Sequence, residues 1–102
     1  MRSVDTDWDT EAGRVADRLN VLGRRWSQRE HAADVAALAG VRSALQQLAD
    51  LTADAAGEPR REVPELAGHA LADQVWVLAH DAASAGAGPA ARDVLATLRR
   101  SL

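Results

Sequence analysis

The apolar residues near the start of the chain recur at alternating intervals of four and three positions. This spacing gathers side chains on one face of an α-helix, and it runs without a break from Trp8 to Trp26. Thr6 or Thr10 can cap the first turn, and the acidic residues around them suit the positive end of a helix dipole. The segment therefore predicts an amphipathic helix with the buried stripe Trp8, Ala12, Val15, Leu19, Leu22 and Trp26.

A second apolar stripe follows, but it does not continue the phase of the first. Ser27 and Glu30 form a capping-box pattern, which predicts that the chain bends and that a new helix begins at Ser27. The alternative is one long helix that presents two faces to two neighbours. The second stripe consists of Leu38, Val41, Leu45, Leu48, Thr52 and Ala55.

Glycine and proline mark the remaining boundaries. Residues 57–63 predict a loop, and Pro64 suits the first turn of a third helix. The glycines at 86 and 88 end that helix, and Pro89 opens a fourth. The third helix would bury Ala67, Leu71, Val75, Leu78 and Ala82, and the fourth Ala91, Val94, Leu95, Leu98 and Leu102.

Four amphipathic helices with short connections, and no segment typical of a strand, predict an all-α chain. We expect one domain over residues 1–102, folded as a small antiparallel four-helix bundle. Its core would be thin, because 23 residues are Ala and the chain has no Phe, Tyr or Ile. An alanine side chain contributes little transfer free energy. This deficit favours completion of the core by dimerisation or by a partner.

Composition narrows the function classes further. The net charge of −3 gives no field that would attract nucleic acid or an anionic membrane, and the absence of Cys removes disulfides and thiolate chemistry. No apolar run is long enough to span a bilayer, and the acidic start is unlike a signal peptide, so the expected location is cytoplasmic. The lack of Lys, Ile, Phe and Tyr indicates a GC-rich, bacterial source.

The most informative polar residues lie on the back of the third predicted helix. His69, Asp73, Trp76 and His80 fall in one narrow sector, opposite the leucines of the same helix. A metal shared by His69 and Asp73 is one interpretation, but two ligands do not complete a zinc site. The other is that Trp76 packs against a protein partner, with the polar residues as its rim. We favour the second, and the sequence shows no phosphate loop or nucleophile motif. It therefore predicts a non-enzymatic interaction module without a cofactor, with a homo-oligomer as the expected assembly.

The alternative function is a small DNA-binding regulator. Residues 34–41 resemble the first helix and turn of a Lac-repressor-type helix-turn-helix, with Ala36 in the helix and Gly40 in the turn. The resemblance implies that Arg42, Gln46 and Gln47 contact DNA. The segment departs from the motif after Val41, where Arg42 replaces the usual Ser or Thr cap.

Overall fold

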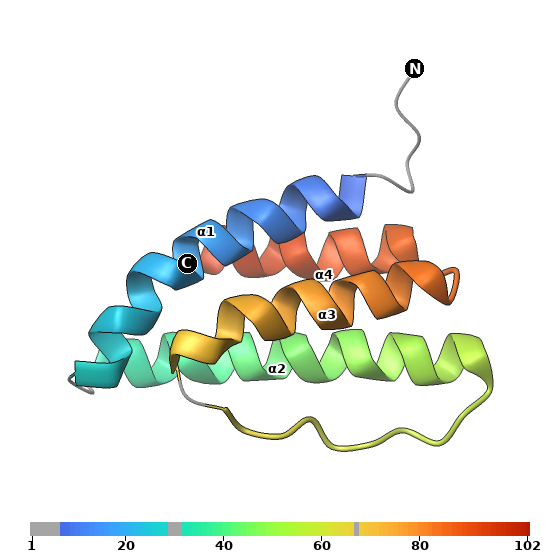
Figure 1. Cartoon of the computed structure of the whole chain (residues 1–102), viewed down its shortest axis with the longest axis horizontal. Helices are drawn as coiled ribbons and strands as arrows, with labels where there is room; N and C mark the ends of the chain where they lie inside the picture. Colours follow the sequence, from blue (N-terminus) through green and yellow to red (C-terminus); the bar gives the residue numbers. More distant parts are fainter. Residues whose placement is uncertain (1–6, 29–31, 67) are drawn as a thin grey trace.

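The computed structural model describes residues 7–28, 32–66 and 68–102, without the side chains of 23–28, 32–34 and 69. Within these ranges the chain forms four α-helices and no strand: α1 (Asp7–Gln28), α2 (Ala32–Ala56), α3 (Leu71–Ser84) and α4 (Gly88–Ser101). A short 3-10 turn, η2 (Gly68–Ala70), leads into α3. The helices pack side by side (Figure 1), which confirms the predicted all-α four-helix bundle.

The helices run in two directions. In Figure 1, α1 and α4 run one way, and α2 and α3 run the other way. Helices α1 and α2 each pack mainly against α3 and α4, so α1 and α2 lie across the core from each other. The pairs α1–α2 and α3–α4 are therefore antiparallel, whereas α2 and α3 are parallel.

The boundary between the first two helices differs from the prediction at Ser27. The backbone of Ser27 is still helical, and α1 continues to Gln28, so Ser27 is not the cap of a new helix. The bend itself is confirmed, because α2 begins at Ala32 and returns in the opposite direction (Figure 1). Residues 29–31, between the two helices, lie outside the described residues. In α1, Ala12, Val15 and Leu19 are buried as predicted.

The loop that the sequence predicts at residues 57–63 is confirmed, but it continues to residue 66 as an extended strap, defined here as residues 57–66. Pro64 does not open a helix, because the strap continues through it and α3 begins only at Leu71. Side chains of the neighbouring helices bind the backbone of the strap and hold it extended. Gln46 donates to the Arg61 carbonyl at 2.9 Å and accepts from the Val63 amide at 3.0 Å, and Gln74 donates to the Pro64 carbonyl at 3.1 Å.

The core lies between the four helices, and its buried members among the described residues are all aliphatic. Its largest fully buried side chains are leucines and valines from all four helices: Leu19, Leu45, Leu48, Leu71, Leu95, Val15, Val41 and Val75. The turn between α3 and α4 uses Gly86 at φ +95°, a conformation that favours glycine, and Pro89 stands in the first turn of α4 as predicted. The two described tryptophan side chains, Trp8 and Trp76, lie outside this fully buried set.

Candidate interaction site

Helix α3 directs Trp76 away from its own leucines, as the helical spacing predicts. Leu71 is fully buried, whereas 40% of Trp76 is exposed, and Asp73 and His80 are also exposed. His69 lies in η2, and its side chain is outside the description. The sector predicted from the sequence therefore faces outward along α3.

The chain itself covers part of Trp76, a contact that the sequence analysis did not anticipate. The indole of Trp8 in α1 meets it edge to face, with ring centroids 6.4 Å apart and planes 79° apart. Trp8 also meets the imidazole of His80 in the same manner, at 6.0 Å and 72°. Gly13 of α1 faces the indole, and a Cβ at this position would lie in ordinary van der Waals contact with the Trp76 ring, at 3.7 Å. Edge-to-face pairs are favourable, so these rings hold one another in place.

An open groove of about 660 Å³ lies along these rings, between α1 and α3. We call it the Trp groove. Trp8, Trp76 and Val77 supply its apolar surface, and the other lining residues are polar: Asp9, Thr10, His80 and Asp81.

A second groove, of about 530 Å³, lies between the strap and α3. We call it the strap groove, and its lining is predominantly apolar, including Pro64, Leu66 and Leu78. Val77 lines both grooves and forms the ridge between them. We refer to the ridge and its two grooves together as the α3 face.

Large apolar side chains are concentrated on the α3 face. Trp76 is 40% exposed, Val77 58% and Leu66 42%, and these are three of the five exposed large apolar side chains among the described residues. The remaining two, Val21 and Val35, lie on α1 and α2. Sequence reasoning did not select Val77 or Leu66, although Val77 lies off the apolar stripe of its helix, a signal that could have identified it.

Helix α1 directs its described arginines and the aspartates around Gly13 to different sides. Arg14 pairs with Glu11 at 3.4 Å, Glu11 accepts from Arg99 of α4 at 2.7 Å, and Arg18 donates to the Leu102 carbonyl at 3.4 Å. These arginines are thus directed towards α4. On the side towards α3, Asp9 and Asp17 stand one turn before and one turn after Gly13, which faces Trp76.

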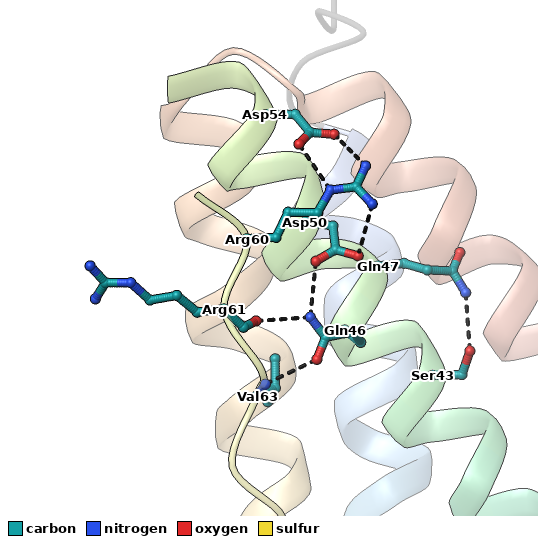
Figure 2. A network of polar contacts seen from close by, with 8 residues as sticks. All are labelled: Ser43, Gln46, Gln47, Asp50, Asp54, Arg60, Arg61 and Val63. Atoms are coloured by element: carbon teal, nitrogen blue, oxygen red, sulfur yellow. Dashed lines mark hydrogen bonds and ion pairs between the residues drawn. The ribbon is translucent and has the colours of Figure 1, made fainter. Parts of the chain in front are cut away.

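The second predicted set, Arg42, Gln46 and Gln47, lies on α2 without a helix-turn-helix around it. Helix α2 continues through Gly40, so the segment has no turn at that position. Arg42 donates to the Leu66 carbonyl at 3.3 Å, and Gln46 binds the strap. Gln47 donates to Ser43 of its own helix at 3.4 Å, and Figure 2 shows this bond together with the network around Gln46. The geometry implied by the resemblance is therefore absent from the described chain.

The network ends in an ion pair that fixes the start of the strap. Arg60 binds Asp54 through two nitrogens, at 2.7 and 3.0 Å, and lies 3.7 Å from Asp50 (Figure 2). The hydrogen bonds from Arg60 hold the pKa of Asp54 below its ordinary value, and those same bonds raise the pKa of Arg60.

The metal interpretation pairs His69 with Asp73, and the side chain of His69 lies outside the described residues. Of the other residues in the predicted sector, Asp73 lines the strap groove and His80 lines the Trp groove. Over the described part of the chain, no three His, Asp or Glu side chains are grouped so that they could hold a metal ion.

No protein family, curated protein or solved structure matches this chain. None of the described helices is long and apolar enough to cross a membrane.

Proposed function

We propose that this chain is a non-enzymatic interaction module and that it binds a protein partner through the α3 face. The observation that supports the proposal is the gathering of Trp76, Val77 and Leu66 around two adjoining grooves. Exposed apolar side chains that are scattered singly need no explanation, but a contiguous group beside a groove is typical of a binding surface.

The aromatic residues strengthen this interpretation. Tryptophan is enriched among the residues that dominate binding energy at interfaces, especially where a pocket surrounds it. Trp8 contacts the ring of Trp76 from one side and is itself in contact with His80, so little side-chain entropy remains to be lost when a partner covers the other side of Trp76. The site is therefore preorganised for docking.

The partner is either a second copy of the chain, as the thin core first suggests, or a different protein. Both assemblies would cover Val77, the ridge of the α3 face, and both would leave Val21 uncovered. These two valines form a matched pair, because they are 58% and 64% exposed and each lies on a helix.

In vivo photo-crosslinking tests the proposal. A benzophenone amino acid replaces Val77 in one variant and Val21 in the other, and both are expressed in the cells that make the protein. We expect a discrete adduct from position 77 only. An adduct of twice the 10.8 kDa chain mass would identify a homodimer, and any other mass a different protein. The same adducts from both positions, or none from position 77, would refute the α3 face as a docking surface.

A further inference from the structure

The backbone of the strap is held to α2 along one edge and faces the strap groove with the other. We infer that the strap groove binds an extended segment of a partner protein, which pairs with the backbone of Glu62 and places apolar side chains against α3. The inference rests on the proposed function and adds to it the conformation and the chemistry of the partner.

Hydrogen bonds show which way each edge of the strap points. In an extended chain, the backbone groups of successive residues point to opposite edges. The Arg61 carbonyl and the Val63 amide both bind one side-chain amide of α2, at 2.9 and 3.0 Å (Figure 2), so the N–H and C=O of Glu62 point to the opposite edge. Two residues further on, the Pro64 carbonyl accepts from Gln74 of α3 at 3.1 Å. The second edge therefore faces α3.

The N–H and C=O groups of Glu62 are consequently available to a partner. No described residue binds either group, and Glu62 is exposed. Backbone groups need a new hydrogen-bond partner when an interface excludes water from them. In an antiparallel pair, one residue of an incoming strand satisfies both groups. Extended peptides add to the exposed edge of other proteins in the same manner.

The strap groove offers an apolar surface beside this edge. Its volume is about 530 Å³, and its lining includes Leu66, which is 42% exposed, and Val77, which is 58% exposed. Alternate side chains of a strand point to one face, so every second side chain of the bound segment would contact this surface. The charged lining residues, Arg61, Glu62 and Asp73, have both signs. Backbone pairing and apolar contact, rather than charge, thus define the partner.

A helical partner fits the strap groove less well. A helix uses its own backbone groups internally, so a helix packed over the strap groove would cover the N–H and C=O of Glu62 without binding them. Covered polar groups that stay unpaired are costly. The same cost applies to a second copy of the chain that docks through its α3 helix. An extended segment with alternating apolar residues binds both the backbone edge and the apolar surface.

Capped peptides of about six residues, roughly 20 Å long when extended, test the inference on the full chain. All three alternate Val and Thr: one is unmodified, the second is N-methylated at its valines and the third at its threonines. The N–H groups of the valines and of the threonines lie on opposite edges, and only one edge can meet the strap. Two-dimensional NMR of the isotope-labelled protein gives the affinities and follows the amide signal of Glu62. We expect the unmodified peptide to move this signal downfield, and only one of the methylated peptides to bind at least about tenfold more weakly.

Variants of the protein locate the binding. Glu62→Pro removes the backbone donor but suits an extended chain, whereas Glu62→Ala keeps the donor. We expect Glu62→Pro to weaken the complex with the unmodified peptide at least about fivefold more than Glu62→Ala does. Val77→Gln should weaken this complex about tenfold, and Val21→Gln should leave it within about twofold.

The outcomes separate this inference from the proposed function. No binding of the unmodified peptide, equal affinities of the two methylated peptides, or equal effects of Glu62→Pro and Glu62→Ala would overturn the extended partner. If photo-crosslinking at position 77 still gave a discrete adduct, the α3 face would remain a docking surface for a partner of another conformation.

Discussion

At the residue scale, the ion pair between Arg60 and Asp54 determines how the strap leaves α2. Arg60 reaches back six positions and meets the carboxylate with two nitrogens, a fork geometry that only arginine provides. Both side chains are exposed, so the pair contributes little stability and instead fixes the direction of the chain. The pKa of Asp54 is the most direct measure of this ion pair.

Replacing Arg60 by Gln should raise the pKa of Asp54 to its ordinary value, because the hydrogen bonds that lower it are removed. In the wild type the folded-state pKa is lower than that of the unfolded chain. The contribution of the pair to stability is therefore present above the ordinary aspartate pKa, about 3.9, and is lost as the pH falls through the lowered value. An NMR titration of the Asp54 carboxyl carbon in both proteins measures the shift. Identical titration curves would show that Arg60 does not bind Asp54 in solution.

At the element scale, the continuity of α2 through Gly40 decides between a bundle helix and a helix-turn-helix. Gly40 does not have a positive φ, and a Cβ added there would meet nothing within 4 Å. Gly57, by contrast, ends α2 at φ +69°, a conformation that costs an L-residue roughly 1–2 kcal/mol.

Gly40→Ala should therefore stabilise the protein by about 0.5–1 kcal/mol, because alanine has the higher helix propensity. Gly57→Ala is the matched control and should destabilise it by about 1 kcal/mol. Urea unfolding of the two variants and the wild type measures both changes. A turn at Gly40 would reverse the first sign, since glycine would then be needed for the turn.

The helices and their connections also differ in how far the sequence predicts them. Periodicity located most of the buried stripe of each helix, because it depends only on residues within that helix. At the ends of the stripes, Ala55 is exposed, and the side chain of Trp26 lies outside the described residues. The extension of the loop to residue 66 was missed because its conformation depends on Gln46, which lies 15 and 17 positions away from the two backbone groups that it binds. The outward direction of Trp76 follows from its own helix, whereas its contact with Trp8 requires knowing that α1 packs against α3.

At the scale of the whole molecule, the buried residues that stabilise the fold differ from the exposed residues that we propose bind a partner. The largest fully buried side chains among the described residues are leucines and valines, and the two described indoles stand at the edge of α1 and α3. A small domain has only about 5–15 kcal/mol of stability, so each buried leucine accounts for a large share of it. The exposed ridge of the α3 face should contribute almost nothing.

Leu95→Ala and Val77→Gln test this division. Leu95 is fully buried, and its truncation leaves a cavity, so we expect a loss of about 2–5 kcal/mol in the free energy of unfolding. Val77 is 58% exposed, and its replacement should change that free energy by no more than about 0.5 kcal/mol. Urea titrations followed by circular dichroism give both values without relying on the tryptophans. If Val77→Gln destabilised the isolated chain as strongly as Leu95→Ala, Val77 would be covered by the chain itself, and the ridge would be part of the core. If the contrast holds, a loss of partner binding in Val77→Gln reports binding alone, because the fold is unchanged.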